Sequence, residues 1–218
     1  MTRVLDKATI EHAFDEIGRR AVSEGVVLDM AVCGGSCLIL ASNIRLASED
    51  VDAVYLNNAD VARNIVRKVT IANQLGEDWL NQAAKQFLFP RFNPEPNLIE
   101  FKNYPRNEAI KGLRIFTPTP EYMLAMKILA NRGSDDLSKN LTDTTDAVAL
   151  MRLTEINTYE KIVDLMQQCY PNVPGIVVPT VSNRIDTKIK NLLRAYDERQ
   201  DNDPEWNAGR GSLLSPQK

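Results

Sequence analysis

Long apolar runs, a strong charge of either sign and clusters of thiols are all missing from this sequence. It holds three cysteines, Cys33, Cys37 and Cys169, and one histidine, His12, among 218 residues. An odd number of cysteines without a tight CxxC spacing argues against a disulfide framework and against a zinc ribbon. A Cys3His zinc site would need His12 to meet all three cysteines. We therefore interpret the cysteines as small buried thiols and His12 as an exposed or packing residue.

The hydrophobic stretches are too short for a membrane, since none approaches the roughly 18–20 residues that cross a bilayer. The N-terminal segment carries Asp6 and Glu11 where a secretory signal needs an unbroken apolar core. We therefore expect a cytoplasmic protein with no membrane partner. The net charge of −3 excludes a global attraction to nucleic acid, although a local basic face stays open.

The chain is long enough for one large domain or two small lobes. Its residues are 44% hydrophobic and 25% charged, as in ordinary globular proteins. Strand and helix patterns alternate up to Thr117, whereas almost every apolar pattern after it is helical. We predict an α/β (α+β) lobe over 1–117, a helical lobe over 118–198 and a flexible tail over 199–218.

Apolar periodicity indicates the elements of the first lobe. Ile10, Phe14, Ile17 and Ala21 recur at helical spacing. The β-branched run from Val26 to Val32 predicts a strand that ends at a glycine pair. The remaining predictions are helices at 36–41 and 59–75, a strand around 50–55, a short helical segment at Trp79 and Leu80, and strands at 98–101 and 113–116. Together they predict a small mixed sheet flanked by helices.

Helix signals dominate the second lobe. Thr119 suits an N-cap, Pro120 the first helical position, and Glu121 the positive end of the helix dipole. This helix is predicted to run to Asn131. Further helices are predicted at 137–153, 159–169 and 183–196.

A glycine turn followed by two aspartates carries the candidate chemistry. Gly34, Gly35 and Ser36 follow a predicted strand, and glycines let the backbone approach a polyphosphate beside the N–H groups of the next helix. Asp50 and Asp52 are one residue apart on a predicted strand. Both carboxylates would therefore project from one face and could bind Mg²⁺ or Mn²⁺. Such an ion would neutralise a triphosphate and activate an attacking hydroxyl.

Neither pattern is specific alone, because Gly-Gly-Ser turns are common in loops and an Asp-x-Asp pair is most often a solvated strand edge. Arg45 and Ser48 lie between the two patterns in the sequence. The combination after a predicted strand favours a nucleotide site that includes Arg45 and Ser48 as well as the turn and the aspartates.

The stretch AVCGGSCLILASNIRLASEDVDAVY resembles the signature of the DNA polymerase beta-like nucleotidyltransferase superfamily, a Gly-Gly-Ser followed by Arg-x-x-Ser/Thr-x-Asp-x-Asp. A second stretch, TPEYMLAMKILANRGSDDLSKNLTDTTDAVALM, looks like the Leu-Ala-x-Lys…Arg…Asp-x-x-Asp block of AbiEii-type toxins and related bacterial nucleotidyltransferase-like proteins. The segment WLNQAAKQF also looks like the latter group. The resemblance spans about residues 10–170 and implies a nucleotidyltransferase fold.

The resemblance implies phosphate contact by Gly35 and Ser36, metal binding by Asp50 and Asp52, and further roles for three residues of the second block. These three are Lys127, Asp143 and Asp146. From the residues alone, Lys127 could equally extend its ammonium from a helix flank, and Asp143 and Asp146 could lie on a solvated helix face. Many members have a third acidic residue on a later strand, and Glu100 stands at a comparable place here. Glu100 could accept the hydroxyl proton, complete the metal site or simply face solvent.

The implied activity is metal-dependent transfer of a nucleoside monophosphate from a nucleoside triphosphate to an acceptor hydroxyl. RNA, above all tRNA, a protein or a small molecule could be the acceptor, and a role in a toxin–antitoxin pair is conceivable. Local phosphate contacts could come from Arg63, Arg67, Lys68, Arg184, Lys188, Lys190 and Arg194, although a solvated face explains each as well. The alternatives are a non-catalytic nucleotide-binding or interaction module with the same fold, and an Asp-x-Asp pair that is only an exposed edge.

Overall fold

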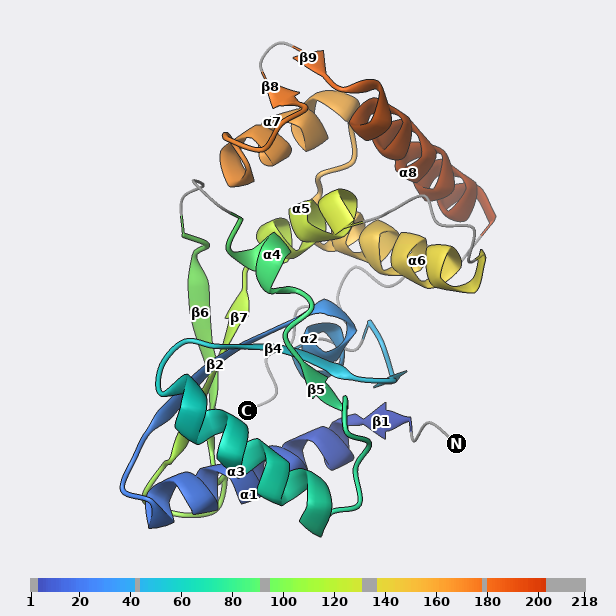
Figure 1. Ribbon diagram of the computed structural model, residues 1–218. Helices are drawn as coiled ribbons and strands as arrows, with labels where there is room; N and C mark the ends of the chain where they lie inside the picture. Colours follow the sequence, from blue (N-terminus) through green and yellow to red (C-terminus); the bar gives the residue numbers. More distant parts are fainter. Residues whose placement is uncertain (1–3, 42–43, 91–94, 131–136, 178–179, 203–218) are drawn as a thin grey trace. The chain divides into compact units, whose positions relative to one another are not determined.

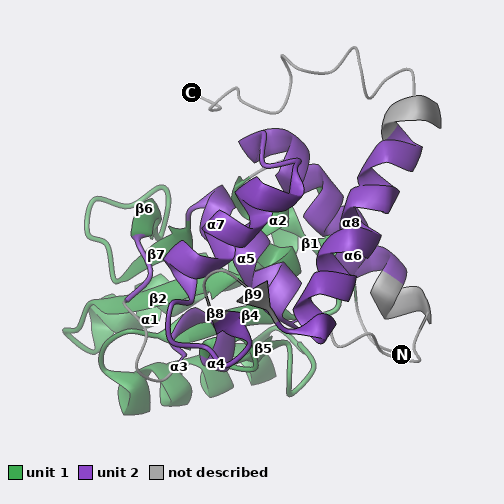
Figure 2. Cartoon of the chain, turned by 90° about the horizontal axis from the view of Figure 1, so that it is seen from above, with its two compact units in different colours: residues 1–85, 98–118 green, residues 86–97, 119–218 purple. Residues whose placement is uncertain are grey.

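The computed structural model describes residues 4–41, 44–90, 95–130, 137–177 and 180–202. These residues fall into two compact units, coloured green and purple in Figure 2. Residues 1–85 and 98–118 belong to the first unit, and residues 86–97 and 119–218 to the second. The segment 86–97 thus groups with the helical half of the chain, although it precedes the last two strands of the first unit.

The first unit contains a mixed sheet of five strands with helices packed around it (Figure 1). The strand order is β5-β4-β2-β7-β6, in which β2 pairs antiparallel with β4 and parallel with β7. The predicted mixed sheet flanked by helices is confirmed. The elements are β1 (Leu5–Asp6), α1 (Lys7–Ser23), β2 (Leu28–Cys33), α2 (Gly34–Ala41), β3 (Ala47–Ser48), β4 (Val51–Tyr55), α3 (Ala59–Ala72), β5 (Leu80–Asn81), β6 (Leu98–Tyr104) and β7 (Leu113–Pro118).

Helix α1 begins at a side-chain cap. The Asp6 carboxylate accepts a hydrogen bond from the Thr9 N–H at 2.8 Å, which satisfies one of the unpaired donors of the first turn. All four members of the predicted apolar stripe, from Ile10 to Ala21, are fully buried. Helices α1 and α3 lie side by side, and α1 packs on β6 and β7 (Figure 1). The stripe therefore forms part of the core of this unit.

Two glycines let α1 approach the β6–β7 hairpin closely. A Cβ atom at Gly18 would lie 2.6 Å from the Tyr104 carbonyl carbon, and one at Gly112 would lie 2.2 Å from the Gly18 carbonyl oxygen. Backbone atoms of both elements occupy the space that side chains would need. The contact is fixed by main-chain packing as well as by apolar burial.

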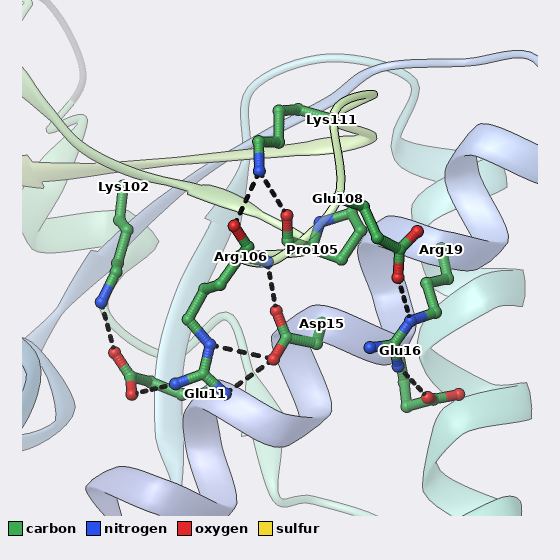
Figure 3. Close-up of polar contacts among 9 residues, drawn as sticks. All are labelled: Glu11, Asp15, Glu16, Arg19, Lys102, Pro105, Arg106, Glu108 and Lys111. Atoms are coloured by element: carbon green, nitrogen blue, oxygen red, sulfur yellow. Dashed lines mark hydrogen bonds and ion pairs between the residues drawn. The ribbon is translucent and has the colours of Figure 1, made fainter.

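An ionic network joins α1 to the same hairpin (Figure 3). Arg106 donates through Nε and Nη2 to Asp15 Oδ2 at 2.9 and 2.7 Å, and through Nη1 to Glu11. Glu11 also accepts from Lys102 Nζ at 2.9 Å. Both carboxylates are buried, so each needs its cation to offset the loss of water.

The short helix expected at Trp79 and Leu80 is wrong. Leu80 and Asn81 form strand β5, which pairs in parallel with Val51 and Asp52 of β4. The Val51 N–H donates to the Trp79 carbonyl at 2.6 Å, and the Trp79 indole donates to Thr70 Oγ1 at 2.7 Å. Two residues give too little periodicity to separate helix from strand, and pairing with β4 decided the outcome.

The second unit is mainly helical, as predicted. Thr119 Oγ1 accepts from the Tyr122 N–H at 3.2 Å at the start of α5, in agreement with its predicted capping role. The elements are α4 (Lys85–Leu88), whose Gln86–Leu88 part belongs to this unit, α5 (Pro120–Ala130), α6 (Leu137–Thr154), α7 (Tyr159–Cys169), β8 (Ile176–Val177), β9 (Thr180–Val181) and α8 (Asn183–Asn202). The predicted helix end at Asn131 lies outside the described residues.

Two tyrosines attach the 86–90 segment to these helices. Tyr122 Oη donates to the Leu88 carbonyl at 3.1 Å, and Tyr170 Oη donates to the Phe87 carbonyl at 2.8 Å. Their rings also pack together at a centroid distance of 5.5 Å. These contacts explain why the segment groups with the second unit.

Helix α8 extends through Asn202, so residues 199–202 of the expected tail are helical. Residues 203–218 of that tail lie outside the described part of the chain. No helix among the described residues has both the length and the apolar character that crossing a bilayer requires.

Candidate functional site

The predicted glycine turn joins β2 to α2 and faces one of the predicted aspartates. Gly34 has a φ of +65°, a backbone conformation that favours glycine. A Cβ atom at Gly34 would lie 2.3 Å from Asp52 Oδ2. Because Asp52 pairs in register with Cys33, the last residue before the turn, its carboxylate is held at the α-carbon of Gly34. The structure thus brings Asp52 and the turn together.

The guanidinium of Arg45 lies against Gly35, the second glycine of the turn. A Cβ atom at Gly35 would lie 2.3 Å from Arg45 Nη1 and 2.9 Å from Cζ, so a side chain at this position would require the guanidinium to move. Arg45 Nε donates to the Ala47 carbonyl at 2.8 Å, which anchors the side chain. A fixed cation beside a glycine turn at the start of a helix creates a local environment that favours anions.

Ser36 and Ser48 are both buried. The Ser36 hydroxyl donates to the Cys33 carbonyl at 2.9 Å across the turn. In this arrangement the hydroxyl stabilises the turn, and contact with a phosphate would require it to exchange that partner. Ser48 lies in β3 opposite Leu5 of β1, and its role in nucleotide binding stays a prediction.

Asp50 lies directly before β4 and is held by a residue that the sequence did not single out. Asn81 Nδ2 donates to Asp50 Oδ2 at 2.7 Å, while Asn81 Oδ1 accepts from the Ala83 N–H at 2.8 Å. Asn81 also stands in register with Asp52 on the neighbouring strand. Asn81 thus donates to one predicted metal ligand and lies in register with the other. It escaped notice because its segment was interpreted as helical, whereas a strand there would have placed it beside the aspartates.

Glu100 does not join this group. It is exposed on β6, at the opposite side of β2 and β7 from β4, and accepts from Asn103 Nδ2 at 2.8 Å. Three strand spacings of ~4.8 Å put β6 about 14 Å from β4. The structure therefore does not bring Glu100 to the predicted metal ligands, and a role for Glu100 in the site stays a prediction. Among the described residues, no three histidine, cysteine, aspartate or glutamate side chains gather as a metal site.

The thiols beside the turn are protonated at neutral pH. Burial raises the pKa of Cys33 well above its ordinary value, and electrostatic interactions with Cys37 and Asp52 raise it further. Burial also raises the pKa of Cys37 to about 12. Both thiols are buried, as predicted, and neither is prepared to act as a nucleophile.

The residues of the second predicted block form a cluster of their own in the second unit. Lys127 Nζ, on α5, donates to Asp143 Oδ1 at 2.7 Å and to Asp146 Oδ2 at 2.9 Å, both on α6. The exposed fraction of the side chain is 12% for Lys127 and 4% for Asp146. Burial lowers the pKa of Lys127, but the charges of Asp146 and Asp143 outweigh burial and raise it overall. The lysine stays charged and its charge is locally neutralised.

Several of the basic residues proposed for phosphate contact have other partners. Arg63 forms an ion pair with Asp60, Lys68 with Glu24 at 2.9 Å, and Lys190 with Asp186 at 2.8 Å. Arg67 and Arg194 are exposed, and His12 is exposed on α1. Arg184 and Lys188 line a cavity in the second unit.

No protein-family model and no curated protein matches the chain. Among solved structures, it is similar to an antigenic nucleotidyltransferase-like protein from Paracoccidioides brasiliensis. The sequence identity is 15% and the TM-score is 0.48, with 91% of this chain and 94% of the other covered.

Proposed function

We propose that the chain is a metal-dependent nucleotidyltransferase that moves a nucleoside monophosphate from a nucleoside triphosphate to an acceptor hydroxyl. One observation carries the proposal, namely the Asp52 carboxylate at the α-carbon of Gly34. A metal-bound triphosphate needs a backbone turn that admits phosphate and an acidic oxygen beside it. Gly34 and Asp52 provide both.

The turn has the features that a polyphosphate requires. Gly34 and Gly35 leave the backbone without side chains, and α2 starts at Gly34, so the first N–H groups of a helix are near. Arg45 adds a positive charge on Gly35. In the proposed complex, Gly34, Gly35 and Ser36 contact the phosphates, and Arg45 and Ser48 support that contact.

In the proposed complex the acidic pair binds a magnesium ion. Mg²⁺ is commonly held by one or two carboxylates together with substrate phosphates and waters, so Asp50 and Asp52 are sufficient protein ligands. Mn²⁺ accepts the same oxygen ligands. When bound, the ion would neutralise phosphate charge and favour ionisation of the attacking hydroxyl. Asn81 would act as a positioning residue, because its hydrogen bond fixes one oxygen of Asp50.

The proposal also concerns the molecule whose hydroxyl accepts the nucleoside monophosphate. An RNA or tRNA end, a protein hydroxyl and a small-molecule hydroxyl satisfy the same reaction geometry, so all three are substrates to test. The resemblance to AbiEii-type toxins favours tRNA and a toxin-like role. The same resemblance assigns nucleotide or catalytic roles to Lys127, Asp143 and Asp146. Such roles would require Lys127 to exchange a carboxylate for a phosphate.

One observation favours a second candidate, a nucleotide-binding module without turnover. Within the described residues Asp52 is the carboxylate shown at the turn, and the in-register position on the adjacent strand is the amide Asn81. An amide cannot act as a general base. A protein of this kind would bind a nucleoside triphosphate with Mg²⁺ and release it unchanged.

Label transfer distinguishes these functions. The purified protein is incubated with Mg²⁺ and each α-³²P-labelled nucleoside triphosphate, with total RNA, a protein extract or a small-molecule extract as acceptor. The variants are Asp52→Asn, which keeps the shape of the side chain, and Asp60→Asn, a matched exposed aspartate on α3. Transfer by the native chain and by Asp60→Asn, but not by Asp52→Asn, is the expected result.

Two other outcomes have clear meanings. Transfer that survives Asp52→Asn contradicts the proposed site. Binding of a triphosphate that depends on Mg²⁺ and Asp52, without transfer to any acceptor, supports the module without turnover.

A further inference from the structure

A cavity of about 460 Å³ is lined wholly by residues of the second unit, none of which belongs to the Gly34–Ser36 turn or to the acidic pair. Its wall comes from the 86–90 segment, the end of α5, the loop after α7 and the first turns of α8. This volume is within the range of about 300–1,000 Å³ that is common for small-molecule pockets. The cavity is therefore large enough for an organic ligand.

The charged groups of the lining all have one sign. Arg184 and Lys188 line the cavity, and no aspartate or glutamate among the described residues does. The two residues stand four positions apart on α8, so their side chains share a face and their charges repel. Neither forms an ion pair with a carboxylate of the described residues. The cavity consequently carries two cationic side chains that no carboxylate of the described residues contacts as an ion pair.

Lys188 is fixed in place at considerable electrostatic cost. Its side chain is buried, and Nζ donates to the carbonyls of Ile128 and Leu129 at 3.2 and 3.1 Å in the last turn of α5. Burial, and to a smaller extent the charge of Arg184, lower the pKa of Lys188 to about 8. An anion in the cavity would stabilise the charged form and relieve the repulsion between the two cations.

The rest of the lining is mainly apolar. Phe87, Pro174 and Ile185 are among the residues that form it, together with the hydroxyl-bearing Ser182. A ligand that matches this lining has an anionic group for the two cations and an apolar or planar part for the wall. A phosphate monoester carries about −1.5 to −2 charges at neutral pH, which equals the charge of the two cations more closely than a carboxylate does.

We propose that this cavity is a binding site for a small organic phosphate, a phosphate monoester attached to a planar or apolar group. Arg184 and Lys188 hold the phosphate, and the apolar wall holds the attached group. The site is independent of the proposed nucleotidyl transfer, since none of its residues belongs to the Gly34–Ser36 turn or to the acidic pair. A polynucleotide fits less well, because the cationic side chains line a cavity and the chain has a net charge of −3.

Titrations followed by backbone amide NMR test the site with phenyl phosphate as the probe. Inorganic phosphate lacks the ring and phenol lacks the charge, so each isolates one half of the proposed recognition. The variant Arg184→Glu reverses an exposed charge of the lining, and Arg194→Glu makes the same change on an exposed part of α8 beyond it. Asp52→Asn, a substitution in the first unit, serves as a reference variant for the binding of phenyl phosphate.

Phenyl phosphate is expected to shift the amides around Arg184, Ile185 and Lys188, and to bind more tightly than phosphate or phenol. Arg184→Glu is expected to weaken binding about tenfold, whereas Arg194→Glu and Asp52→Asn change it less than twofold. Equal weakening by both charge reversals would indicate attraction to the whole helix and overturn the site. The absence of saturable shifts, or saturable binding of single-stranded RNA but not of phenyl phosphate, would also overturn it.

Discussion

The carboxylate of Asp52 lies at the α-carbon of Gly34, where a methyl group would come within 2.3 Å of Oδ2. Gly34→Ala is therefore expected to displace Asp52 and to strain a backbone with a φ of +65°. The strain costs about 1–2 kcal/mol of unfolding free energy, and Mg²⁺-dependent triphosphate binding should be lost. Chemical denaturation and calorimetric titration measure the two effects.

Gly25 supplies a matched control for this substitution. Its φ is +70°, but a Cβ atom there would meet nothing within 4 Å. Gly25→Ala should show the same backbone strain and leave triphosphate binding intact. If Gly34→Ala binds the triphosphate as Gly25→Ala does, the Asp52–Gly34 contact has no part in the site.

Asn81→Asp would place a third carboxylate beside Asp50. In the absence of metal, repulsion between the two carboxylates should lower the melting temperature at neutral pH, because Asp50 loses the amide that donates to it at 2.7 Å. Mg²⁺ should then raise the melting temperature more than it does for the native chain. A melting temperature that responds to Mg²⁺ equally in the two proteins would contradict a metal site at Asp50.

Lys127→Met should remove the ammonium that donates to Asp146, a side chain of which only 4% is exposed. We expect a loss of about 3 kcal/mol of unfolding free energy, as for other broken buried ion pairs. A double-mutant cycle with Asp146→Leu should give a coupling energy of about 2 kcal/mol. The exposed pair of Lys190 and Asp186 provides the comparison and should couple by less than about 1 kcal/mol. Similar coupling in both pairs would show that burial adds nothing to the α5–α6 contact.

Arg106→Gln removes the guanidinium that serves the buried carboxylates of Glu11 and Asp15 (Figure 3). The loss should be about 3–5 kcal/mol, because two carboxylates remain without their main partner. Arg19→Gln removes an arginine from the exposed pairs with Glu16 and Glu108 and should cost less than about 1 kcal/mol. Urea denaturation of both variants checks the difference, and equal midpoints would contradict it.

Lys188 should titrate near pH 8 in side-chain NMR, because burial and then Arg184 lower its pKa to about 8. The unfolded chain has an ordinary lysine pKa of about 10.4, so it binds more protons than the folded chain between these two values. The contribution of this group to the unfolding free energy therefore rises with pH over that interval. Arg184→Gln should raise the midpoint only modestly, since burial is the larger cause. An ordinary midpoint near 10.4 would be inconsistent with a desolvated ammonium.

The contribution of Lys127 to the unfolding free energy should change with pH in the opposite direction to that of Lys188. Its pKa is raised by Asp146 and Asp143 in spite of burial, so its stabilising contribution is fully present below the ordinary lysine pKa. That contribution is lost only as the pH rises through the raised value.

Local patterns predicted the elements that are long or strongly periodic. The stripe from Ile10 to Ala21 is buried in α1, and the helix predicted at 159–169 is α7. Such segments repeat their apolar residues over several helical turns, so the spacing fits a helix and does not fit a strand. At Trp79 and Leu80 the pattern was too short, and the hydrogen bonds of β4 produced a strand.

The candidate site was predictable only in part, for a related reason. Gly34 and Asp52 each carry a local signal, a glycine before a helix and an acidic residue on an alternating strand. Gly34 and Asp52 are 18 residues apart in the sequence, and it is the pairing register of β2 and β4 that brings them together. Asn81 carries no such signal, and its place beside Asp50 depends on the parallel pairing of β5.

The sequence by itself determined the helical and strand periodicities, the glycine turn and the identity of the acidic pair, because these depend on neighbouring residues and on the chemistry of each side chain. The tertiary structure alone decided that Asp52 faces Gly34, that Asn81 holds Asp50, that Glu100 is three strands from β4, and that Lys127 is neutralised by two carboxylates. Strand order and helix packing set these distances, and they result from burying the whole set of apolar faces at once.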